Sequence, residues 1–131
     1  DPKPEEDVLV ELARRIEPDG GMPGGNDEER LVNTLTALLV LAEEGHTSAR
    51  GAFRHHVRRL LAYLKKADCA VLGSEKAAGV VAAIAAVEAG QSIAGPWREL
   101  ITRYLAGESI QADMVWSALE KHVRQGDRPN P

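Results

Sequence analysis

Apolar residues recur at intervals of three and four positions along most of the chain, which is the spacing of one face of an α-helix. No run alternates apolar and polar residues over the length of a strand. The pattern therefore predicts an all-α fold of about six helices. They are expected at residues 4–17, 26–44, 48–66, 74–89, 96–106 and 110–125.

Two of these segments carry too many apolar residues for a single face. In 26–44, Val32 and Leu41 widen a stripe of leucines, so we expect this helix to be buried on more than one side. The segment 74–89, SEKAAGVVAAIAAVEA, is apolar nearly all round and is built from small residues. Such a helix is typical of the middle of a bundle, where helices approach closely, and we expect it there.

Polar residues mark the expected starts of three helices. Asn26, followed three positions later by Glu29, forms a capping pair for the second helix. Thr47 or Ser48 is expected to cap the third helix, and Ser74 the fourth.

The second half of the chain resembles the first. GAFRHHVRRLL aligns with GPWRELITRYL, and the preceding helices align after a slip of one residue. The repeated unit is a helix, a glycine turn and a helix, which gives antiparallel αα-hairpins over 27–66 and 74–106. Helix 4–17 and helix 110–125 lie at the two ends. Residues 1–131 are thus expected to form a single helical domain, a short solenoid or an arc of an α/α toroid.

The repeat makes two predictions about side chains. Phe53 aligns with Trp97, and each should be an anchor buried between the helices of its own hairpin. Each turn also carries a glutamate and an arginine in matching places, so ion pairs should cross both turns. The expected pairs are Glu43 with Arg54 and Glu88 with Arg98.

Charge and hydropathy narrow the classes of partner. The chain has 131 residues with 16 basic and 20 acidic side chains, a formal charge of 16 − 20 = −4. This excess of acidic side chains argues against nucleic acid as a partner. No apolar run approaches the ~18 residues that a membrane span needs. The chain opens with DPKPEED and has no initiator Met, which is typical of a processed product or an excised piece of a longer protein.

The stretch EPDGGMPGGNDEER, residues 17–30, suggests a phosphate-binding loop because it is rich in glycine and precedes a helix. However, it has no lysine, it does not follow a strand, and it enters a helix that begins with acidic residues. We therefore expect a long flexible connector. Calcium held by Asp19, Asp27 and loop carbonyls is a weaker alternative, because the spacing matches no EF-hand.

The remaining candidate groups predict no metal, cofactor or catalytic cluster. His55 and His56 are adjacent on a helix and point about 100° apart, while His46 lies in a turn and His122 on a core stripe. The single cysteine, Cys69, is interpreted as a small buried apolar residue. We expect no catalytic residue, no cofactor-binding residue and no metal ligand.

The third helix carries a dense set of cations. These are Arg50, Arg54, Arg58, Arg59, Lys65 and Lys66. They spread over its outer half, which is typical of a solvated face. An acidic partner surface or a neighbouring domain is the alternative.

The segment 17–61 resembles the helical part at the C-terminal end of some bacterial proteins that carry a VIT domain and a von Willebrand factor A domain. More broadly, TALLVLAEEGHTSARGAFRHHVRRLLAYL, with PDGG closing the first helix, resembles the hairpin repeats of the prenyltransferase and squalene–hopene cyclase superfamily. The cyclases' acidic motif is absent, and Met22 replaces their aromatic residue after the turn. The resemblance therefore implies a shared scaffold without the enzyme activity.

These observations favour a non-catalytic helical interaction or architectural module of a larger von Willebrand factor A-type bacterial protein. Its partners would be other protein domains, in the same chain or in another protein. The alternatives are a fragment of an α/α-toroid enzyme without its catalytic residues and a small-ligand-binding helical domain. The sequence indicates no oligomeric state and no location, although the resemblance is compatible with the cell envelope.

Overall fold

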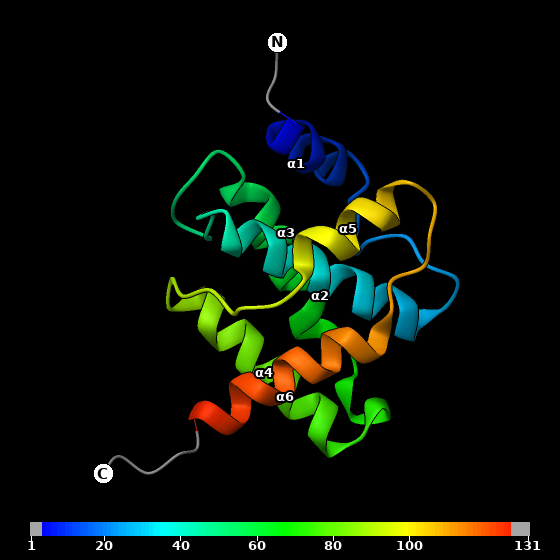
Figure 1. Cartoon of the computed structure of the whole chain (residues 1–131), viewed down its shortest axis with the longest axis vertical. Coiled ribbons are helices and arrows are strands. Elements are labelled where there is room, and N and C mark those ends of the chain that lie inside the picture. The colour runs from blue at the N-terminus through cyan, green and yellow to red at the C-terminus, as the bar shows by residue number, and fades with distance from the viewer. Residues whose placement is uncertain (1–3, 127–131) are drawn as a thin grey trace.

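The computed structural model describes residues 4–126, and within them every regular element is helical (Figure 1). The prediction of an all-α fold is therefore confirmed. The helices are α1 (Pro4–Arg14), α2 (Asp27–Glu43), α3 (Arg54–Lys66), α4 (Ser74–Glu88), α5 (Trp97–Leu105) and α6 (Ala112–Gly126), with a 3₁₀ turn, η1 (Cys69–Leu72), before α4.

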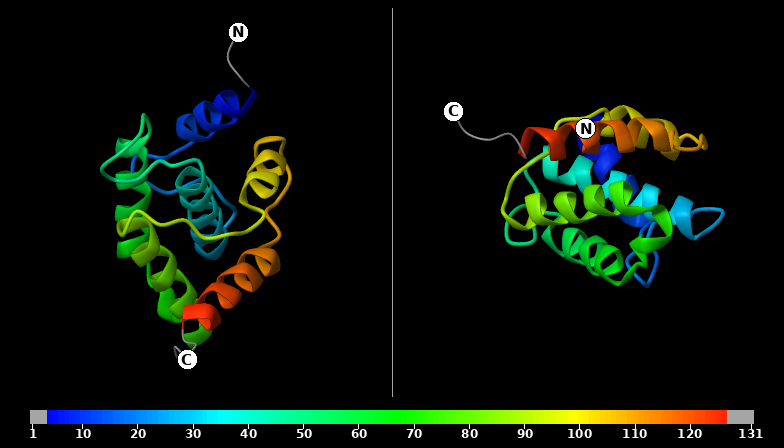
Figure 2. Two further views of the ribbon diagram at one scale, coloured as in Figure 1. Left: turned by 60° about the vertical axis from the view of Figure 1, so that its left-hand side comes forward. Right: turned by 90° about the horizontal axis from the view of Figure 1, so that it is seen from below.

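Helix α2 forms the centre of the molecule. Every residue from 31 to 42 is buried, so the helix has no solvent-facing side over three turns. Seen from below, α2 runs between the yellow α5 and orange α6 on one side and the green α3 on the other (Figure 2). The prediction that this helix is buried on more than one side is confirmed, and its leucines supply much of the core.

Helices α3 and α5 cover α2 with narrow apolar stripes. The buried residues of α3 are Val57, Leu60, Leu61 and Leu64, and those of α5 are Trp97, Leu100 and Ile101. This spacing of three and four positions is the one expected from the sequence. Charged residues occupy much of the outer faces of both helices.

The composition of α4 predicted a place in the middle of the bundle, but this prediction is wrong. It packs mainly against α6, with further contacts to η1 and α2, and its outer side faces solvent. Val81 on that side is 64% exposed. Burial of apolar area stabilises by about 25 cal/mol per Å², so the bulky leucines of α2 gain more from the central place than the alanines of α4.

The second hairpin of the predicted repeat is also not formed. The helices of the first, α2 and α3, pack together as expected, but α5 packs against α2 and α1 while α4 packs against α6. The loop from 89 to 96 carries the chain across the molecule from α4 to α5 (Figure 1). The two aligned segments share helical periodicity, but their helices pack against different partners.

Helix α3 begins at Arg54, six residues after the expected start. Thr47 caps a tight turn instead, because its hydroxyl accepts hydrogen bonds from the N–H groups of Ala49 (3.2 Å) and Arg50 (3.0 Å). Gly51 then adopts φ = +92°, which a helix cannot contain and which L-residues with side chains rarely adopt. The backbone therefore turns once more before the helix starts.

The predictions for the other helix boundaries are confirmed only in part. The Asn26 side chain accepts a hydrogen bond from the Glu29 N–H at 2.8 Å, which confirms one half of the predicted capping pair. Ser74, expected as the cap of α4, is its first residue, and Gly73 takes the cap position without a side-chain bond. Helix α1 ends at Arg14, earlier than the expected Glu17.

Candidate functional site

The loop before α2 is held by buried hydrogen bonds, whereas its glycines predicted a connector without such contacts. Met22 is fully buried, and its N–H donates to the hydroxyl of Thr34 at 2.8 Å. Gly20 and Gly21 are buried as well. Thr34 itself lies in the middle of α2, so the central helix holds the loop through a buried hydrogen bond.

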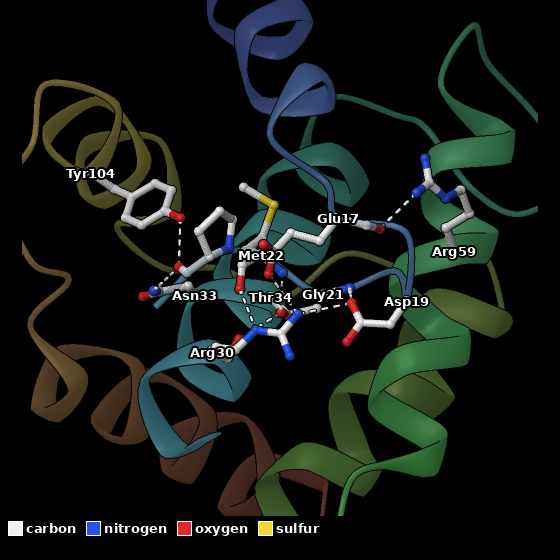
Figure 3. A network of polar contacts seen from close by, with 10 residues as sticks. Glu17, Asp19, Gly21, Met22, Arg30, Asn33, Thr34, Arg59 and Tyr104 are labelled. Atoms are coloured by element: carbon white, nitrogen blue, oxygen red, sulfur yellow. Dashed lines mark hydrogen bonds and ion pairs between the residues drawn. The ribbon is translucent and has the colours of Figure 1, made fainter. Parts of the chain in front are cut away.

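Arg30, in the first turn of α2, joins the two ends of this loop (Figure 3). Its guanidinium contacts the carboxylates of Asp19 and Glu17, each at 2.8 Å, and donates to the Met22 carbonyl at 3.2 Å. It also lies over the ring of Tyr63, 5.0 Å from the centroid. The hydrogen bond from Arg30 lowers the pKa of the Asp19 carboxyl, and the same bond raises the pKa of Arg30.

Further bonds tie the loop to three helices. The Pro23 carbonyl accepts from the Asn33 amide and from the Tyr104 hydroxyl, both at 2.8 Å (Figure 3). Arg59 on α3 donates to the Glu17 carbonyl at 2.7 Å. Asp19 and the loop carbonyls, which were among the groups that suggested a calcium site, are thus engaged in bonds to α2, α3 and α5, whereas Asp27 is exposed and outside this network.

Two histidines enclose Phe53 at the turn before α3. The ring of His46 meets the Phe53 ring edge-on at 4.9 Å, and the His56 ring lies 5.5 Å from it at a tilt. The Nδ1 atoms of both histidines are buried without a hydrogen-bond partner. Burial lowers the pKa of His56, and the charges of Arg59 and His55 lower it further. The half-buried place expected for His56 is confirmed.

No group of three or more His, Cys, Asp or Glu side chains is placed to hold a metal ion within the described part of the chain. Cys69 is half-buried rather than fully buried. Burial and the nearby Asp68 raise the pKa of its thiol, the reverse of what a reactive thiolate needs.

The two predicted anchors differ in burial. Trp97 is fully buried, as expected, but not between the helices of its own hairpin, because α4 and α5 do not pack as a pair. Its indole N–H donates to the Ile93 carbonyl at 2.6 Å. Phe53 is only half-buried, because the late start of α3 leaves it in the turn against the two histidines.

Neither predicted ion pair is among those formed by residues 8–124. Arg98 pairs with Glu44 and not with Glu88. Glu88 pairs instead with Lys65 of α3, whose Nζ lies 2.6 Å from Glu88 Oε2. The pairs form between helices that pack together, α4 with α3 and α5 with the end of α2, and the sequence repeat did not predict these neighbours. Burial raises the pKa of Glu43, and the adjacent Glu44 raises it further.

The outer face of α3 remains strongly cationic in the folded protein. Arg54, Arg58 and Arg59 each donate to a backbone carbonyl, those of Gly51, Ser48 and Glu17. None of these arginines, nor Arg50 or Lys66, pairs with a carboxylate among the side chains that the structure describes. All five are exposed. A guanidinium has five donors, so each arginine keeps free N–H groups for an external acceptor.

A groove of about 710 Å³ adjoins this cationic face. One wall is the C-terminal half of α3 with η1, and the other is the loop at 18–20 with the start of α2. Leu31, Tyr63 and Leu72 give it an apolar base. Val71 of η1, 77% exposed, stands at its edge. The groove could not be predicted from the sequence, because it depends on contacts between segments about 40 residues apart.

No protein-family model matches this sequence, and neither a curated protein nor a solved structure matches it. Within residues 4–126, no helix combines the length and the apolar character needed to cross a bilayer.

Proposed function

We propose that the protein is a non-catalytic helical interaction module, part of a larger von Willebrand factor A-type bacterial protein, and that α3 is the surface it presents. The observation that carries this proposal is the row of exposed cations on α3 that bond backbone carbonyls but no carboxylate. In a chain of net charge −4, such a face attracts an acidic partner.

The partner we infer is an acidic protein surface rather than a nucleic acid or a lipid. No exposed Phe, Tyr or Trp, the side chains that stack best on single-stranded bases, is found among the described residues of the α3 face. The apolar stripe of α3 is buried against α2, so α3 cannot insert into a membrane interface as an amphipathic helix would. Arg54 and Arg58, one helical turn apart, match carboxylates at the same spacing on a partner helix.

The test is binding of a labelled alanine-based peptide of about 20 residues with glutamate at every fourth position, followed by fluorescence anisotropy at low salt. The double variant Arg54→Gln/Arg58→Gln should bind it more weakly. Exposed charge pairs contribute about 0.2–1 kcal/mol each, so the loss should be roughly 2- to 30-fold.

The matched control is Arg103→Gln/Arg124→Gln, which removes the same charge (−4 − 2 = −6) from arginines already paired with glutamates on α5 and α6. Equal weakening in both double variants would show that only net charge matters, and the proposal would be wrong. A 20-base-pair DNA or phosphatidylserine vesicles bound in preference to the peptide would equally overturn it.

A further inference from the structure

The groove beside α3 has rims of opposite charge. Arg59 and Lys66 stand on the α3 wall, and Asp27 and Glu28 stand on the α2 wall. All four side chains are exposed. Asp68 adds a carboxylate at the η1 end, where it caps the N–H of Ala70 at 3.1 Å. Between the walls, Asp19 and Arg30 neutralise each other.

The groove also leaves an apolar side chain uncovered. Val71 is the most exposed of the large apolar residues that the structure describes. Single exposed apolar side chains are common on protein surfaces, but this one borders a groove whose base is apolar. The apolar base, the uncovered valine and the charged rims together form the pattern of a surface that receives a helix.

We propose that this groove accepts an amphipathic helix of the protein partner, with its apolar stripe over Val71 and its acidic edge along α3. The opposite edge of that helix is basic and faces Asp27 and Glu28. Because the two rims differ in sign, a helix of this kind binds in one direction, since reversal would place like charges together. The inference rests on the proposed function, because the acidic edge meets the same cationic face.

The test uses three synthetic helical peptides of one length, followed by fluorescence anisotropy. The first has a leucine stripe with glutamates along one edge and lysines along the other. The second has the same composition, but glutamate and lysine are mixed on both edges. The third keeps the segregated edges and replaces the leucines by alanine. The first should bind best, and each of the others should lose at least several-fold in affinity.

Two valines provide a matched pair of variants. Val71→Ser should weaken the first peptide about three- to tenfold, because it removes apolar area that the bound helix would cover. Val81→Ser makes the same change at an exposed valine of α4 outside the groove and should leave the affinity unchanged. Both positions are exposed, so the melting temperature of the two variants should equal that of the parent protein.

The outcomes separate this inference from the proposed function. Suppose that the glutamate peptide depends on Arg54 and Arg58, while Val71→Ser and the peptide edges have no effect. The groove inference is then wrong and the interaction module stands. Binding that depends on Val71 but not on those arginines would refute the α3 proposal, and with it the acidic edge that this inference places along α3. A co-purified small molecule that occupies the groove and blocks the first peptide would overturn the inference in favour of ligand binding.

Discussion

Replacing Thr34 by valine should detach the loop from the central helix. Valine has nearly the shape of threonine, so packing is kept while the hydroxyl is lost. The Met22 N–H, which donates to that hydroxyl at 2.8 Å, is then buried without a partner. A buried donor left unsatisfied costs about 1–3 kcal/mol, a large share of the ~5–15 kcal/mol that stabilises a domain.

Thr36→Val is the control that isolates this cost. Thr36 lies on the same helix, is equally buried, and bonds only the Val32 carbonyl four residues earlier. That carbonyl keeps its backbone partner in the helix, so the loss of the Thr36 hydroxyl leaves no buried donor unsatisfied. Both substitutions gain the same apolar methyl group. The difference between the two variants, measured by urea unfolding, should therefore be about 1–3 kcal/mol.

Hydrogen exchange locates the effect. In Thr34→Val, protection of the Met22 amide should fall roughly 5- to 150-fold, the factor that corresponds to the same free energy. Equal unfolding free energies for the two valine variants, with Met22 protection unchanged, would refute the view that this bond holds the loop.

Three further outcomes are expected. Trp97→Ala should lower the free energy of unfolding by about 3–5 kcal/mol, measured by chemical denaturation, because the ring is fully buried. Because burial, with a smaller effect from Arg59, lowers the pKa of His56 below its ordinary 6.5, the histidine stabilises the fold fully above pH 6.5. Stability should fall as the pH drops through 6.5 toward the folded-state pKa, and His56→Gln should flatten this part of the melting-temperature profile. Gly20→Ala should destabilise far more than Gly45→Ala in thermal melts. Both glycines have positive φ, but a Cβ at Gly20 would collide with the Arg59 carbonyl oxygen while the space at Gly45 is open.

The sequence predicted the elements of this fold better than their arrangement. Helical spacing located α2, α3 and α5 and their buried faces, because the contrast between apolar and polar residues is strong there. Helix α4 offers no such contrast: alanine and valine fill nearly every side, so nothing in its pattern states which side faces the core. The place of α4, and with it the second hairpin, depends on nonlocal packing that periodicity does not encode.

The hydrogen bonds that hold the loop at 17–30 could not be predicted for a related reason. Glycines permit many conformations in an isolated segment, and the sequence shows that freedom directly. The groups that remove it are distant in the chain: Thr34, Tyr104 and Arg59 reach the loop from three different helices. The cationic face of α3 could be recognised from the sequence, because its arginines lie on one helix. The groove beside it could not.

The burial of α2 on every side has a consequence for how the protein is made. A ribosome finishes α2 at residue 43, but α5 and α6, which cover part of it, appear only between residues 97 and 126. Until then the nascent chain exposes a helix rich in leucine, the kind of surface that promotes aggregation and recruits chaperones. A product truncated just before Trp97 should therefore be insoluble, and silent codon changes that slow synthesis between α2 and α5 should lower the yield of soluble protein.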